Sequence, residues 1–107
     1  MSNLSLKNNP TLKDYQVYIE EMVKERGFGK ETIPELFLRL SEEVGEMAKA
    51  SRRCIGMSTD SNSRKPELAQ EVADVFIYIL AICNYFDVDL EKAFRDKEEI
   101  NKKRTWQ

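Results

Sequence analysis

Two segments of this chain combine a helical stripe of apolar residues with a pair of acidic residues three positions apart. The first pair is Glu43 and Glu46, and the second pair is Glu71 and Asp74. On an α-helix, residues i and i+3 share a face. Two like charges on one face repel each other, at a cost of about 0.2–0.5 kcal/mol per pair. Because this repulsion occurs twice, we expect a cation between the two pairs.

The periodicity predicts four helices, over about residues 12–26, 33–52, 66–86 and 89–104. Thr11 and Thr32 are the expected N-caps of the first two helices, and either Asp87 or Asp89 is expected to cap the fourth. Sustained period-2 alternation, which is typical of strands, is nearly absent. The chain is therefore predicted to be all-α, with a protomer resembling a four-helix bundle.

The length of 107 residues predicts a single domain over residues 1–107. Residues 1–10 are interpreted as a flexible N-terminal arm, and residues 53–65 as a long loop that joins the two acidic helices. Loops of this length are usually functional or disordered, so closure over a ligand and plain disorder both stay open. The apolar residues of the third helix extend around it, which indicates burial at a bundle centre or a dimer interface.

The composition excludes several classes of site and partner. The chain has no histidine, which excludes Ser–His and Cys–His catalysis and Cys₂His₂ zinc sites. A net charge of −2 argues against nucleic acid and anionic membranes as partners. We find no apolar run of 18 residues and no signal peptide, so we expect a cytoplasmic protein without a transmembrane helix. Acid–base chemistry then falls to Glu, Asp, Lys, Tyr or water.

The acidic residues lie at the borders of the apolar stripes. At about 100° per residue, Glu43 lies at the edge of the second helix's stripe. Glu46 lies about 60° further out, and Glu42 lies toward solvent. Glu71 and Asp74 flank the stripe of the third helix. Packing the two stripes together would bring both pairs to one rim, where carboxylate oxygens suit Mg²⁺.

The fourth helix has a face that changes from apolar to basic along its length. This face ends with Lys97, Asn101 and Arg104, and we expect it to point inward. Phosphate oxygens suit Lys and Arg, and Asn donates or accepts hydrogen bonds beside them. The alternative is that these residues are solvated at a fraying C-terminus. Carboxylates for Mg²⁺ and cations for phosphates together indicate phosphoryl or nucleotidyl chemistry, and no Walker A motif is present.

These motifs resemble those of the MazG-like, all-α nucleoside triphosphate pyrophosphohydrolases. The signature of that family is E-x-x-E followed, after a gap, by E-x-x-D. The segments EVGE at 43–46 and EVAD at 71–74 match it, and Glu42 gives the longer EExxE form. The C-terminal segment KEEINKKRTW is similar to the family's ending. The resemblance extends over about residues 12–106.

The resemblance implies Mg²⁺-dependent hydrolysis of nucleoside triphosphates, in particular dNTPs, to the monophosphate and pyrophosphate. It implies that Glu43, Glu46, Glu71 and Asp74 hold one or more Mg²⁺ ions, for which Mn²⁺ can substitute. A water bound to metal, or positioned by Glu42 or Glu46, would attack the α-phosphorus. Glu42, Glu43 and Glu46 are thus the implied catalytic residues.

The resemblance also implies which residues bind the substrate. They are Lys97, Asn101 and Arg104 for the phosphates and sugar, Phe37 or Phe28 for the base, and Tyr78, which neighbours the second acidic pair. It further implies a homodimer or homotetramer with sites near the subunit interfaces, and a role in cleaning nucleotide pools. Rival interpretations are a dUTPase-like hydrolase, a phosphoribosyl-ATP pyrophosphohydrolase, and a non-catalytic helical module whose acidic rim binds a basic partner.

Overall fold

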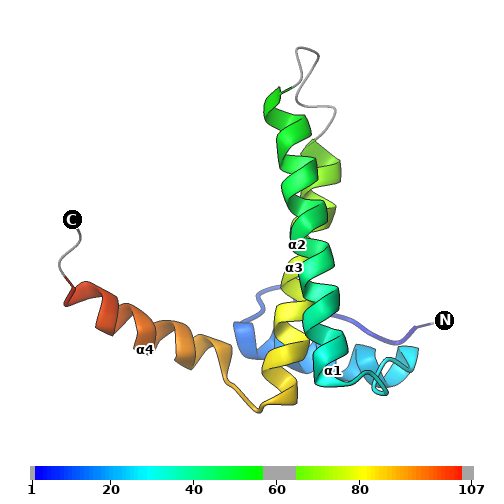
Figure 1. The fold of residues 1–107 in the computed structure, drawn as a ribbon. Helices are drawn as coiled ribbons and strands as arrows, with labels where there is room; N and C mark the ends of the chain where they lie inside the picture. The colour runs from blue at the N-terminus through cyan, green and yellow to red at the C-terminus, as the bar shows by residue number, and fades with distance from the viewer. Residues whose placement is uncertain (1, 57–64, 105–107) are drawn as a thin grey trace.

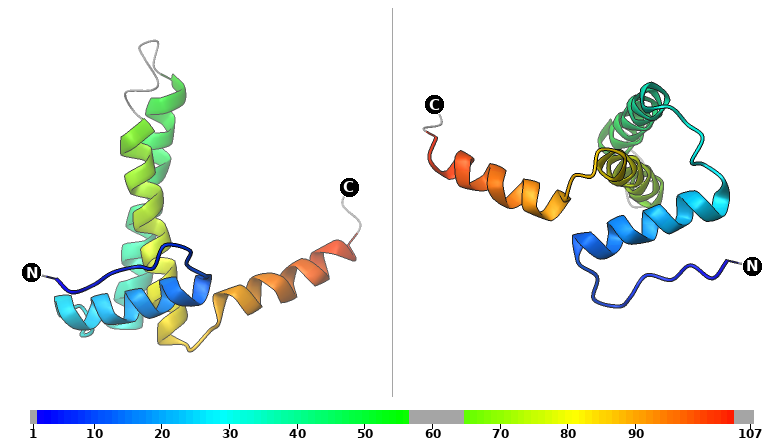
Figure 2. Two further views of the ribbon diagram at one scale, coloured as in Figure 1. Left: turned by 180° about the vertical axis from the view of Figure 1, so that it is seen from behind. Right: turned by 90° about the horizontal axis from the view of Figure 1, so that it is seen from below.

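The computed structural model describes residues 2–56 and 65–104, which form four α-helices (Figure 1). The helices are α1 (Leu12–Arg26), α2 (Ile33–Gly56), α3 (Lys65–Tyr85) and α4 (Leu90–Lys102). Within these described ranges no strand occurs, which confirms the all-α prediction. Two of the helices, α2 and α3, lie side by side along their length, while α1 crosses near the C-terminal end of α3 (Figure 2).

The second helix ends four residues later than the sequence predicts. It continues through residues 53–55 to Gly56, because Arg, Cys and Ile tolerate a helix and the next poor helix former after residue 52 is Gly56. Arg53 also donates a hydrogen bond of 2.7 Å to Glu67 of α3, which joins the two helices near this end. The predicted loop 53–65 is therefore shortened at both ends, and its central part, with any closure over a ligand, lies outside the described residues.

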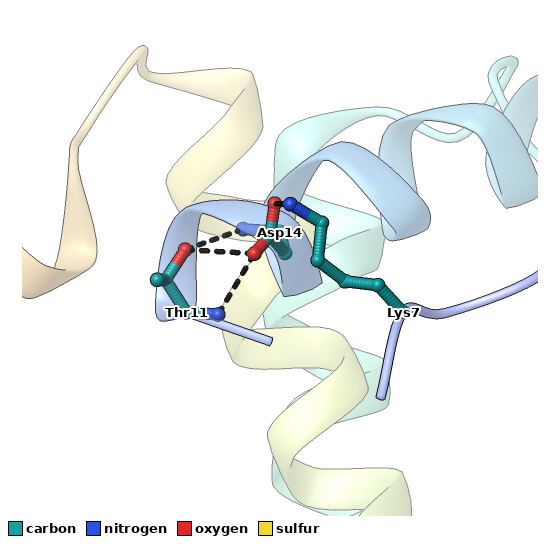
Figure 3. A network of polar contacts seen from close by, with 3 residues as sticks. All are labelled: Lys7, Thr11 and Asp14. Atoms are coloured by element: carbon teal, nitrogen blue, oxygen red, sulfur yellow. Dashed lines mark hydrogen bonds and ion pairs between the residues drawn. The ribbon is translucent and has the colours of Figure 1, made fainter. Parts of the chain in front are cut away.

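Hydrogen bonds between side chain and backbone define where the first helix starts. The Asp14 N–H donates to Thr11 Oγ1 at 3.2 Å, and the Thr11 N–H donates to Asp14 Oδ2 at 2.9 Å (Figure 3). Lys7 lies 3.4 Å from the same carboxylate. The backbone hydrogen bond from Thr11 is the main cause that lowers the pKa of Asp14. The predicted N-cap at Thr11 is thus confirmed as a complete capping box.

α2 and α4 also begin at a residue whose side chain accepts a hydrogen bond from a backbone N–H of the first turn. Thr32 Oγ1 accepts a hydrogen bond of 3.3 Å from the Glu35 N–H, as the sequence predicts. At α4 the cap is Asp89, whose carboxylate accepts from the Lys92 N–H at 3.1 Å. Asp87, the other candidate, instead adopts a left-handed backbone conformation with φ of 56°, which closes the end of α3.

A small apolar core holds α1 against α3. Ile19 and Met22 of α1 and Leu80 of α3 are buried and contact one another. Tyr15 and Phe76 pack edge to face beside them, with ring centroids 5.5 Å apart. Fully burying an aliphatic side chain of this size stabilises a fold by about 1.5–3 kcal/mol. The core is therefore modest for one chain.

A buried glutamine connects α1 to the turn between α3 and α4. Gln16 is only 4% exposed. Its amide nitrogen donates to Asn84 Oδ1 at 3.0 Å and to the Val88 carbonyl at 2.8 Å, and its amide oxygen accepts from the Leu90 N–H at 3.0 Å. Asn84 donates in return to the Gln16 carbonyl at 2.8 Å. These bonds orient the turn and therefore the direction in which α4 leaves.

The N-terminal arm contacts the rest of the chain although it forms no helix or strand in the part that the structure describes. Leu4 packs against the core of α1 and α3. The Ser2 hydroxyl donates to Glu25 at 2.8 Å, near the far end of α1. The arm consequently runs back along α1, as Figure 2 shows.

Large apolar side chains stay exposed on α3 and α4. On α3, Leu80 is the one buried residue among those described, and Val72 is 48% exposed. By length and composition alone α3 could cross a membrane, but a single helix of this kind is weak evidence, and the absence of a transmembrane helix stays a prediction. On α4, Phe94 and Ile100 are 64% and 55% exposed. The expectation that α4 turns its mixed face inward is thus wrong for the single chain.

Candidate metal centre

The packing of α2 against α3 brings three carboxylates together. One carboxylate oxygen each from Glu43, Glu71 and Asp74 lies within 4.8 Å of the other two. Oxygen ligands around one octahedral Mg²⁺ lie about 3–4 Å apart, so small side-chain rotations would allow all three to share an ion. We call these three residues the acidic cluster. It contains three of the four predicted metal ligands.

The electrostatics of the acidic cluster favour a bound cation. Burial, followed by the negative charges of Asp74, Glu71 and Glu46, raises the pKa of Glu43 above its usual value. A hydrogen bond with Glu71 adds to this shift. All these influences disfavour the ionised form, and a divalent cation would reverse the balance by attracting it. The donor set of carboxylate oxygens fits Mg²⁺ or Mn²⁺.

The two remaining acidic candidates lie at the edge of this cluster. Glu46 is exposed and is not one of the three converging carboxylates, although its charge acts on Glu43. Glu42 is exposed and is also not part of the acidic cluster. Glu46 therefore lies near enough to Glu43 to influence its ionisation, whereas no interaction within the described residues connects Glu42 with the cluster.

A cavity of about 580 Å³ adjoins the acidic cluster, and Asp74 belongs to both. This volume is within the range of small-molecule sites. Its wall combines apolar and aromatic residues from α1, α3 and the turn between α1 and α2, namely Met22, Val23, Phe28, Ile77, Tyr78 and Tyr85. A flat apolar group such as a nucleobase suits a wall of this kind.

Two of the three predicted aromatic candidates line the cavity. Tyr78 and Phe28 belong to its wall, whereas Phe37 is 48% exposed and is not among the lining residues. Burial is the main cause that raises the pKa of Tyr78, and the charges of Glu43 and Asp74 add to it. Tyr78 therefore lies close to the acidic cluster as well as to the cavity.

Sequence reasoning missed an ion pair in the cavity wall. Glu31 and Arg39 both line the cavity, and Arg39 Nε lies 3.3 Å from Glu31 Oε1. The two residues are eight positions apart, which is not a spacing that places side chains in contact on one helix. The only sequence signal was an acidic residue just before the N-cap Thr32, where a helix favours negative charge.

The predicted phosphate-binding residues of α4 lie apart from the acidic cluster in the single chain. Within the described residues, α4 packs mainly against α1 and points away from the α2–α3 pair (Figure 1). Lys97 and Arg104 are exposed, and Asn101 donates a hydrogen bond of 3.1 Å to Glu98. One protomer thus does not bring the carboxylates and these three residues together.

The raised pKa of Glu43 predicts how stability depends on pH and metal. Because the folded state holds this proton more tightly than the unfolded state, metal-free stability should fall as the pH rises through the raised pKa. Glu43→Gln removes the charge, so its melting temperature without metal should exceed that of the wild type at pH 8. The same change should weaken Mg²⁺ binding at least about tenfold.

Thermal unfolding followed by circular dichroism, with and without Mg²⁺ at pH 5 and pH 8, measures both effects. Glu21→Gln is the matched control, because Glu21 is exposed on α1 and is not part of the acidic cluster. Equal stabilisation of Glu43→Gln and wild type by Mg²⁺ would contradict the assignment of Glu43 as a metal ligand.

Comparison with known proteins places this site in a family. The family model described as the MazG nucleotide pyrophosphohydrolase domain matches residues 31–105. The chain is 32% identical to dCTP pyrophosphatase 1 of Homo sapiens and 30% identical to that of Rattus norvegicus. Each match covers 94% of this chain and 62% of the relative, so the chain spans less than two thirds of their length. The matched region contains the acidic cluster and α4, and the chain belongs to the MazG nucleotide pyrophosphohydrolase family.

Proposed function

We propose that this protein hydrolyses nucleoside triphosphates, in particular dNTPs, to the monophosphate and pyrophosphate with Mg²⁺. The observation that carries the proposal is the acidic cluster next to a cavity large enough for a nucleoside, with Asp74 in both. Family membership supports the reaction, and the relatives named for dCTP support a deoxynucleotide substrate. The proposed role is the cleaning of nucleotide pools in the cytoplasm.

In this proposal Glu43, Glu71 and Asp74 hold the metal. When bound, Mg²⁺ neutralises the charge that develops on the phosphates and orients the triphosphate. Glu46, at the edge of the cluster, accepts a proton from the attacking water. The water oxygen bonds to the α-phosphorus, the bond from that phosphorus to its bridging oxygen breaks, and pyrophosphate leaves with the electron pair. Tyr78 and Phe28 hold the nucleoside in the cavity.

The reaction predicts a defined set of products and a strict metal requirement. Wild-type protein should release pyrophosphate and dNMP from a mixture of the four dNTPs only when Mg²⁺ or Mn²⁺ is present. Asp74→Asn should lower kcat/KM at least about 100-fold, because it weakens both metal binding and the position of the substrate. Ion-exchange chromatography of the products measures this, with Glu21→Gln as the control.

Three results of this assay, with dUTP and phosphoribosyl-ATP tested as further substrates, would contradict the proposal in different ways. Formation of dNDP and phosphate would show attack at another phosphorus. Turnover of dUTP alone or phosphoribosyl-ATP alone would favour the two related hydrolases. No turnover of any of these compounds would favour a non-catalytic helical module.

We further propose that the working unit is a homodimer or homotetramer in which α4 of one subunit covers the α2–α3 pair of another. The exposed Phe94 and Ile100 of α4 would meet exposed apolar residues such as Phe37 and Val44 of α2. The basic end of α4 would then meet a surface rich in carboxylates. Such an arrangement would supply Lys97, Asn101 and Arg104 to the partner's triphosphate. It would also cover the apolar surface of α3.

Mixing two inactive variants tests this exchange. Asp74→Asn damages the acidic cluster, and Lys97→Ala damages the basic end of α4. If α4 acts on the partner subunit, co-expressed variants should regain up to about a quarter of the wild-type activity. In a random mixture of symmetric dimers about half are mixed, and each mixed dimer has one intact site of two. If α4 acts within its own chain, each mixed dimer contains two damaged sites, and the mixture should be as inactive as either variant.

A further inference from the structure

One residue of the cavity wall, Glu31, has a carboxylate oxygen that lacks a partner. Glu31 Oε1 pairs with Arg39 at 3.3 Å, whereas Glu31 Oε2 is buried and has no hydrogen-bond partner among the described residues. A buried acceptor without a donor is unfavourable, because it has lost its contact with water and gained nothing in return. Because Glu31 lines the cavity, a small rotation of its carboxylate would present this oxygen to a ligand, and an N–H group of the ligand would remove that cost.

Neighbouring polar groups of the cavity already have partners of their own. Asn84 exchanges two hydrogen bonds with Gln16, and Lys24 pairs with Glu20 at 3.4 Å. Asp74 belongs to the acidic cluster. Glu31 Oε2 is a polar atom of the described wall that is both buried and without a partner, which marks the pair of Glu31 and Arg39 as a group that can read a ligand.

Tyr78 lies close enough to this ion pair and to the acidic cluster to be influenced by the charges of both. The charges of Glu31 and Arg39 act on its hydroxyl group, and so do those of Glu43 and Asp74. A nucleotide with its phosphates at the acidic cluster would extend its base along Tyr78 toward Glu31. The unpartnered oxygen would then face the edge of the base.

Resting on the proposed function, we infer that Glu31 selects a base with an exocyclic amino group. An amino group presents only hydrogens, and carboxylates accept from the N4 amino group of cytosine in other recognition sites. Arg39, held beside Glu31, donates to the acceptor next to that amino group. Uracil and thymine carry a carbonyl oxygen at the same position, which would face Glu31 Oε2 as a second acceptor and leave both unsatisfied.

The sharpest test compares cytosine with uracil, which differ at this position by an amino group and a carbonyl oxygen. For the wild type, kcat/KM for dCTP should exceed that for dUTP by about 10- to 100-fold, the discrimination that one well-placed base contact provides. Glu31→Gln should bring the two values close together, because an amide both donates and accepts. Retained or increased dUTP turnover shows that the variant is folded. Glu21→Gln should leave the ratio unchanged.

Calorimetric measurement of dCMP and dUMP binding distinguishes a failure of this inference from a failure of the proposed reaction. Wild-type cleavage of dCTP and dUTP at equal rates, or an unchanged ratio in Glu31→Gln, would overturn the inference and leave the proposed function standing. If neither triphosphate is cleaved but dCMP binds more tightly than dUMP, with the preference lost in Glu31→Gln, the base readout stands and the reaction fails. No cleavage and no preference would overturn both.

Discussion

The rest of this structure depends on the packing of α2 against α3, because that contact gathers like charges at one place. Glu43 would be an ordinary surface carboxylate on an isolated helix. Beside α3 it meets Glu71 and Asp74, and its pKa rises as burial and repulsion disfavour its charge. Apolar burial between the helices must offset this cost when no metal is bound. A cation that enters the cluster converts the repulsion into binding free energy.

The proposed function also requires a wall that positions a substrate next to the acidic cluster. α1 supplies it by packing Ile19 and Met22 against Leu80, and the turn after α1 places Phe28 and Glu31 at the cavity. The buried Gln16 fixes the turn after α3 in the same region. Substrate binding and the direction of α4 thus depend on the same small core. The core is small and large apolar side chains of α3 and α4 stay exposed, and the proposed partner subunit would cover them.

Local signals allowed much of the fold to be predicted from the sequence. Thr11 and Thr32 use their own side chains to start helices, so short-range patterns are enough to find them, whereas Asp89 was one of two candidates that only the structure distinguished. The acidic cluster could be predicted because acidic residues at i, i+3 spacing, beside the apolar stripes of two helices, come to lie along one rim when the stripes pack together. The predicted end of α2 was wrong because none of residues 53–55 opposes a helix.

Features that depend on tertiary geometry could not be predicted in this way. An apolar face on α4 is the same whether it packs within its own chain or on a partner, so periodicity cannot distinguish the two cases. The contact of Glu31 with Arg39 depends on the path of the turn before α2, which no motif encodes. Phe37 and Phe28 were equivalent as apolar candidates until the structure placed only Phe28 in the cavity wall.

The central claim is that the carboxylates of α2 and α3 form one metal site. The most direct measurement is the anomalous scattering of Mn²⁺ in crystals of the protein grown with that ion. The account predicts a peak about 2 Å from a carboxylate oxygen of each of Glu43, Glu71 and Asp74. A peak elsewhere on the surface, or none at these carboxylates at millimolar Mn²⁺, would contradict it.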